Sequence, residues 1–192
     1  MPAIKAERVG DIAIKAVFLD LDGTLHDFEA AARKAMKPVF YSVKMRYPAI
    51  TDAALKIGYE RIWESALQTS YSDGRSSKET RSERFSALLS CFGIDDPKLV
   101  AEMVEKYEDA LKKEVRLFEK ARRVLIKIGK KYDLYIVTDG SEWAKTVIEA
   151  LGITIHFRDI FTSEAAKASK RDGGLFRHVL EKTDLRPQEA IA

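Results

Sequence analysis

The chain has 192 residues, of which 46% are hydrophobic and 33% are charged. This length suits one domain, or one domain with a smaller domain inserted, and the apolar fraction supports a full hydrophobic core. The single cysteine, Cys91, excludes a disulfide scaffold. The net charge of +3 comes from 33 basic and 30 acidic residues, and such a mixed surface is not typical of nucleic-acid binding.

No apolar run approaches the ~20 residues of a membrane span, and the first residues lack the apolar centre of a signal peptide. We therefore expect no membrane partner and a cytoplasmic location. The sequence leaves the oligomeric state open.

A first buried strand is predicted by the continuous apolar run 16–19, which ends at Asp20. Such runs are typical of parallel sheets, in which both faces of a strand are covered. Gly23 then allows a tight reversal of the chain. The dozen residues before the run read as a loose leader or an edge segment.

Helical patterns dominate the chain from residue 28 to about residue 114. Amphipathic helices are expected over four segments, 28–43, 55–66, 85–92 and 97–111. The polar stretch 70–77 reads as a loop, and Asp96 followed by Pro97 is typical of a helix start. Cys91 falls on the apolar side of the third helix, where we expect a small buried hydrophobe.

The pattern changes after residue 115. Strands are predicted at 134–137 and 160–161 and from residue 190 onward, with helices between them. Strands that alternate with helices indicate a parallel α/β sheet. We predict a Rossmann-like, parallel three-layer sandwich with an inserted α-helical bundle. The core would comprise residues 1–27 and 116–192, and the helical insertion residues 28–115.

Two carboxylates, Asp20 and Asp22, follow the first strand. Ligands of open α/β sheets bind at the carboxyl ends of the strands, so Asp20 and Thr138 should share a site. A carboxylate there can attack phosphorus to form an aspartyl-phosphate, and a second acid can protonate the leaving group and then activate water. A hard cation such as Mg²⁺ would share the first carboxylate.

The run Asp-Leu-Asp-Gly-Thr-Leu at 20–25 resembles the first motif of the haloacid dehalogenase-like (HAD) hydrolases. The run 138–140 resembles their second motif, although Asp139 stands where Asn is common. Residues 170–172 are similar to the third motif, with Arg171 in place of the usual Pro. The helical insertion resembles the family's C1-type cap. By the order and spacing of these motifs, the chain is identified as a member of this family from about residue 17 onward.

The resemblance implies a role for each motif residue. Asp20 would be the nucleophile and a ligand of Mg²⁺, while Asp22 would be the general acid and base, with its backbone carbonyl on the metal. The phosphate-binding set that the resemblance implies is Leu21, Thr138, Asp139 and Lys170. Asp139 is expected to act through its backbone, and Lys170, rather than Lys167, keeps the family spacing.

We therefore expect a Mg²⁺-dependent phosphatase that hydrolyses a small phosphorylated metabolite through an aspartyl-phosphate. Dehalogenases of the family usually lack the acid at the position of Asp22. A dehalogenase, a phosphomutase and a catalytically weak regulatory domain that keeps the phosphate pocket remain alternatives.

Other residues in and beside the insertion carry weaker signals. Arg81 and Arg84 can contact an anionic substrate, although most surface arginines are solvated, and His26 is expected to line the entrance. Three aromatic residues read as bundle core: Phe28, Trp63 and Phe85.

A fourth motif, with a further acid on the metal, would fall just beyond residue 192. We expect either that the natural protein continues past Ala192 or that it is a degenerate member.

Overall fold

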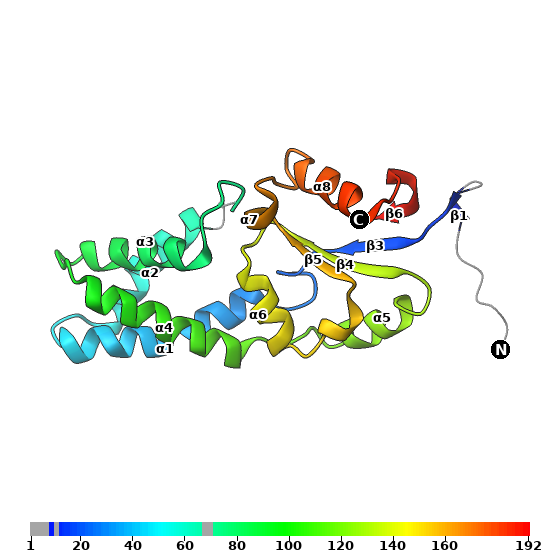
Figure 1. Cartoon of the computed structure of the whole chain (residues 1–192). Coiled ribbons are helices and arrows are strands. Elements are labelled where there is room, and N and C mark those ends of the chain that lie inside the picture. The colour runs from blue at the N-terminus through cyan, green and yellow to red at the C-terminus, as the bar shows by residue number, and fades with distance from the viewer. Residues whose placement is uncertain (1–7, 10–11, 67–70) are drawn as a thin grey trace.

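The computed structural model describes residues 8–9, 12–66 and 71–192. Its centre is a four-stranded parallel sheet with the strand order β5-β4-β3-β6 (Figure 1). The strands are β3 (Ala16–Leu19), β4 (Asp133–Thr138), β5 (Asp159–Thr162) and β6 (Ala190–Ile191). In this register Leu19 lies beside Ile136, and Thr138 lies beside Thr162. The prediction of a parallel α/β sheet is confirmed.

Helices cover both faces of the sheet, which makes three layers (Figure 1). On one face, α8 (Gly174–Thr183) packs against Phe18 and Val137. On the other face lie α5 (Ala121–Ile128) and α6 (Trp143–Ala150), in one apolar cluster with Ile136. The shorter elements are α7 (Ser163–Ala166) and two 3₁₀ turns, η1 (Thr154–His156) and η2 (Pro187–Glu189).

A helical bundle is inserted between β3 and β4 and extends from one end of the sheet (Figure 1). Its helices are α1 (Phe28–Arg46), α2 (Asp52–Ala66), α3 (Ser77–Ser90) and α4 (Pro97–Glu114). Asp27 and Asp96 cap α1 and α4, because each carboxylate accepts a hydrogen bond from a first-turn N–H. The apolar core of the bundle is continuous with the core beneath the sheet.

Helix α3 begins earlier than its apolar pattern indicated. Ser76 and Glu79 form a capping box, in which Ser76 Oγ accepts from Glu79 N at 3.2 Å and Glu79 Oε2 accepts from Ser76 N at 2.8 Å. The first two turns are polar, so apolar spacing could not mark them. The expected burial of Cys91 was wrong: the helix ends at Ser90, and the thiol is exposed.

The described part of the N-terminal segment forms a short antiparallel pair, β1 (Arg8–Val9) with β2 (Ile12–Ala13). The rest of the predicted leader, residues 1–7 and 10–11, lies outside the described residues, as does the first residue of the predicted loop 70–77. None of the helices that the structure describes is both long enough and apolar enough to cross a membrane.

The packing of α5 against the sheet can be tested by two substitutions at neighbouring positions, one buried and one exposed. Leu125 is fully buried, whereas its neighbour Val124 is 49% exposed. We expect Leu125→Ala to lower the free energy of unfolding by about 2–5 kcal/mol, because it leaves a cavity in the core. Val124→Ala should stay within about 0.5 kcal/mol of wild type. Urea denaturation measures both, and equal effects would contradict this packing.

Glu189 ties β6 to the start of β3. Its carboxylate accepts hydrogen bonds from Arg186 Nη2 at 3.0 Å and pairs with Lys15 Nζ at 2.7 Å. The bonds from Arg186 and then Lys15 lower the pKa of Glu189 to about 2. A carboxyl group whose pKa is lower in the folded protein stabilises the fold at neutral pH. This stabilisation is lost as the pH falls through the folded-state pKa.

We expect Glu189→Gln to unfold more readily than wild type at pH 7. The difference should shrink as the pH falls from about 4.5 toward 2, because wild type then loses the same charge. Thermal melts across this pH range measure it. A difference that is independent of pH would show that the charge of Glu189 does not act as described.

Candidate active site

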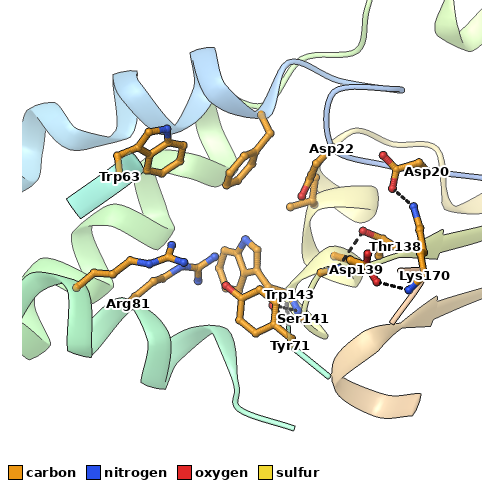
Figure 2. A pocket seen from close by; sticks show the side chains of 15 residues that line it. Asp20, Asp22, Trp63, Tyr71, Arg81, Thr138, Asp139, Ser141, Trp143 and Lys170 are labelled. Atoms are coloured by element: carbon orange, nitrogen blue, oxygen red, sulfur yellow. Dashed lines mark hydrogen bonds and ion pairs between the residues drawn. The ribbon is translucent and has the colours of Figure 1, made fainter. Parts of the chain in front are cut away.

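The carboxyl ends of β3 and β4 open into a cavity of about 390 Å³ between the sheet and the helical bundle (Figure 2). The sheet side of the cavity is lined by Asp20, Asp22, Thr138, Asp139, Ser141 and Lys170. The structure thus brings together all the predicted site residues except Leu21, whose side chain is buried in the core. Any contact of Leu21 with a ligand would therefore use its backbone.

Asp20 is paired with Lys170, although 150 positions separate them in the chain. Lys170 Nζ lies 2.5 Å from Asp20 Oδ1, and Thr24 Oγ1 donates to Asp20 Oδ2 at 3.3 Å. The side chains of Asp20 and Lys170 are 34% and 24% exposed, so both can meet a ligand in the cavity. Lys167 is exposed and does not line the cavity.

Asp139 also has a structural role through its side chain, beside the backbone contact to phosphate that the sequence predicts. Its Oδ1 accepts a hydrogen bond from Lys170 N at 2.8 Å. This bond fixes the backbone from which the Lys170 side chain reaches Asp20. The family's usual Asn also offers a side-chain oxygen here, which could have indicated an acceptor at this position.

Thr138 ends β4 and is buried at the floor of the cavity. Its Oγ1 accepts from Gly140 N at 3.2 Å. The turn that follows is held by Ser163, whose Oγ donates to Asp139 O at 2.8 Å. The Thr138 hydroxyl and the neighbouring turn therefore present a fixed polar surface beside Asp20.

Asp22 lies next to Asp20 and faces the cavity, with 43% of its side chain exposed (Figure 2). Its Oδ1 lies 2.8 Å from Nε2 of His26. His26 is fully buried and does not line the cavity, so the expectation that it lines the entrance was wrong. The chain can reverse between these residues because Gly23 has a φ of +77°, and its N–H donates to His26 O.

The bundle supplies the opposite wall of the cavity. Aromatic and basic side chains line it, from Phe28, Trp63, Tyr71, Arg81 and Arg84, and Trp143 of α6 adds a further ring. Phe28 and Trp63 pack partly buried against the bundle core, as expected, and their stacked rings, 6.0 Å apart, also line the cavity. Phe85 is buried, as expected. Which aromatic side chains face the cavity depends on how the bundle sits on the sheet, and helical spacing does not specify that.

Arg81 is only 7% exposed and joins the bundle to the sheet side of the molecule. Its Nη1 lies 2.5 Å from Glu108 Oε1, and its guanidinium lies 4.5 Å from the Trp143 ring centre, within cation–π range. Lys112 Nζ lies 5.2 Å from the same ring. This burial was not predicted from the sequence, although the spacing of Arg81 four residues before Phe85 could have indicated a place on the inner face of α3.

The donor set at the strand end fits a hard divalent cation. Asp20 and Asp22 present carboxylate oxygens to the cavity, the ligand type that Mg²⁺ prefers. Among the residues that the structure describes, no three His, Cys, Asp or Glu side chains gather into a cage. Mg²⁺ commonly binds through one or two carboxylates and keeps several waters, so the Asp20 carboxylate beside a backbone carbonyl fits such a site.

The comparisons with known proteins agree with this layout. The family model of the haloacid dehalogenase-like hydrolases matches residues 14–192. The HAD-hydrolase YfnB of Bacillus subtilis is 29% identical over 170 residues, which cover 88% of this chain and 69% of that protein. The glyceraldehyde 3-phosphate phosphatase of Methanothermobacter thermautotrophicus is 26% identical, over 93% of this chain and 75% of that protein.

The crystal structure of YfnB bound to magnesium superposes with a TM-score of 0.70 at 26% identity, over 91% of this chain and 75% of that one. The 2-haloacid dehalogenase of Pseudomonas syringae shares the fold at 21% identity, with a TM-score of 0.66, over 92% of this chain and 76% of that one. Since the family match spans nearly the whole chain, this protein belongs to the haloacid dehalogenase-like hydrolases.

Proposed function

We propose that this chain is a Mg²⁺-dependent phosphatase that hydrolyses a small phosphomonoester through an aspartyl-phosphate. The observation that carries the proposal is the pair of carboxylates, Asp20 and Asp22, at the end of a central strand beside Lys170. A nucleophile, an acid and a cation within one cavity are what a two-step phosphoryl transfer requires.

In the first step a carboxylate oxygen of Asp20 attacks phosphorus as the ester P–O bond breaks. Asp22 gives its proton to the departing alkoxide oxygen. In the second step Asp22, now ionised, takes a proton from water, which attacks phosphorus and releases phosphate from Asp20. Lys170 and the Thr138 hydroxyl stabilise the negative charge on the phosphoryl oxygens throughout.

Asp20, through its carboxylate, and Asp22, through its backbone carbonyl, would hold Mg²⁺, which would lower the repulsion between the Asp20 carboxylate and the phosphoryl group. Asp22 favours a phosphatase over a dehalogenase, since displacement of a halide needs no proton for the leaving group. The magnesium-bound relative and the three relatives described as glyceraldehyde 3-phosphate phosphatases support the same choice.

Helices α1–α4 would act as a C1-type cap over the site, with domain limits at 1–27, 28–115 and 116–192. The cavity of about 390 Å³ suits a small metabolite. Arg81 and Arg84 on its far wall would favour a substrate with further polar or anionic groups. Glyceraldehyde 3-phosphate therefore belongs in the first substrate panel.

The direct test is release of phosphate from p-nitrophenyl phosphate and from a panel of sugar and triose phosphates, with added Mg²⁺ or with EDTA. We expect turnover with Mg²⁺ and its loss with EDTA. Binding of phosphate without turnover of any substrate would contradict a phosphatase and favour a regulatory domain. Release of halide from 2-haloacids would favour a dehalogenase.

Asp20→Asn should abolish turnover while leaving the fold intact, because the change is nearly isosteric but removes the nucleophilic charge. Phosphate release measures the rate, and circular dichroism with a thermal melt checks the fold. The matched control is Asp109→Asn, at a carboxylate on α4 that is exposed and outside the cavity. If the Asp20 variant keeps most of the wild-type rate, Asp20 is not the nucleophile.

Asp22→Asn should lower kcat/KM by about 10²-fold or more for an alkyl phosphate, the scale of a lost general acid. The loss should be smaller for p-nitrophenyl phosphate, because its leaving group departs without a proton. Steady-state kinetics on the two substrates compares the losses. Equal losses would show that Asp22 does not protonate the leaving group.

A further inference from the structure

We propose that His26 is a positioning residue that fixes the carboxylate of Asp22 for proton transfer. The inference rests on the proposed phosphatase function and assigns a role to a residue that lies outside the cavity. It follows from the burial of the imidazole, its hydrogen bond to Asp22 and the backbone contacts that hold it in place.

The imidazole of His26 makes one side-chain hydrogen bond, to Asp22. His26 Nε2 lies 2.8 Å from Asp22 Oδ1, while Nδ1 is buried without a hydrogen-bond partner in the described part of the chain. Since the proton that Asp22 transfers would sit on Oδ2, Oδ1 accepts in this bond and Nε2 carries its hydrogen. A leucine would fill the same space without burying a second nitrogen, so packing alone does not account for a histidine here.

The backbone holds the ring of His26 firmly behind Asp22. His26 O accepts from Gly23 N at 2.9 Å and from Phe28 N at 3.2 Å. Residue 26 also bridges to Leu117, so it lies where the two segments that connect the bundle to the sheet pass each other. The Phe28 ring meets the imidazole edge-on at 6.2 Å. The ring is therefore fixed relative to both parts of the molecule.

In this arrangement the two carboxylate oxygens of Asp22 have different roles. Oδ1 is held by His26, which leaves Oδ2 to exchange a proton with the leaving-group oxygen and then with water. A general acid contributes most when its oxygen stays within hydrogen-bond reach of the group that it protonates. Because His26 is fully buried and absent from the cavity wall, it acts through Asp22 and touches no substrate.

Three variants separate positioning from packing. In His26→Gln the amide nitrogen can occupy the place of Nε2 and donate to Asp22. In His26→Asn a similar amide is too short to do so, and His26→Leu has no donor. The readout is kcat/KM, which reports the first chemical step. It is measured for p-nitrophenyl phosphate and for phenyl phosphate, because the departure of phenol depends more on protonation than that of p-nitrophenol. Thermal melts check that each variant is folded.

We expect the Asn and Leu variants to lose about tenfold more activity on phenyl phosphate than on p-nitrophenyl phosphate, part of the effect of a general acid. The Gln variant should restore the wild-type ratio between the two substrates. If all three variants lose activity equally on both substrates, or if Asn performs as well as Gln, the positioning role is overturned. A wild-type protein inactive on every phosphomonoester would instead overturn the proposed function, and this inference with it.

Discussion

The rest of the site depends on the ion pair between Asp20 and Lys170. A carboxylate at the end of a buried strand is costly unless a cation compensates its charge. Lys170 provides that charge from a loop far along the chain, and Asp139 holds its backbone. These two contacts join three segments of the chain around β3 and β4. In the proposed mechanism the same pair supplies the nucleophile and a cation for the phosphoryl group. Stability of the strand end and the proposed chemistry therefore depend on the same atoms.

The helical insertion completes the site from the other side. Its apolar core runs into the core beneath the sheet, so the bundle cannot be treated as a detached module. At the cavity, Arg81 connects the bundle to α6. It pairs with Glu108 inside the bundle and covers the Trp143 ring of α6. The two segments that connect the bundle to the sheet are joined by a bridge between residues 26 and 117. The cavity thus has one wall of acids and a lysine, and another of rings and guanidinium groups.

The sequence predicts what depends on local pattern and on the geometry of parallel sheets. Apolar runs that end at Asp20 and Thr138 locate the strands, and the clustering of strand ends in a parallel sheet places these two residues in one site. Sequence patterns fail where tertiary packing decides. Nothing local marks His26 as buried behind Asp22, and helical spacing does not tell that Trp63 faces a cavity. The start of α3 escapes apolar spacing for a different reason, because the capping box of Ser76 begins two polar turns.

In the proposed mechanism a phosphoryl group passes through the carboxylate of Asp20. The most direct measurement is to quench the enzyme in acid during turnover of p-nitrophenyl phosphate and treat it with borohydride, which reduces an aspartyl-phosphate to homoserine. Peptide mass spectrometry then locates the product. We expect homoserine at position 20, and none at position 22. Homoserine elsewhere, or turnover with position 20 unmodified at every quench time, would contradict it.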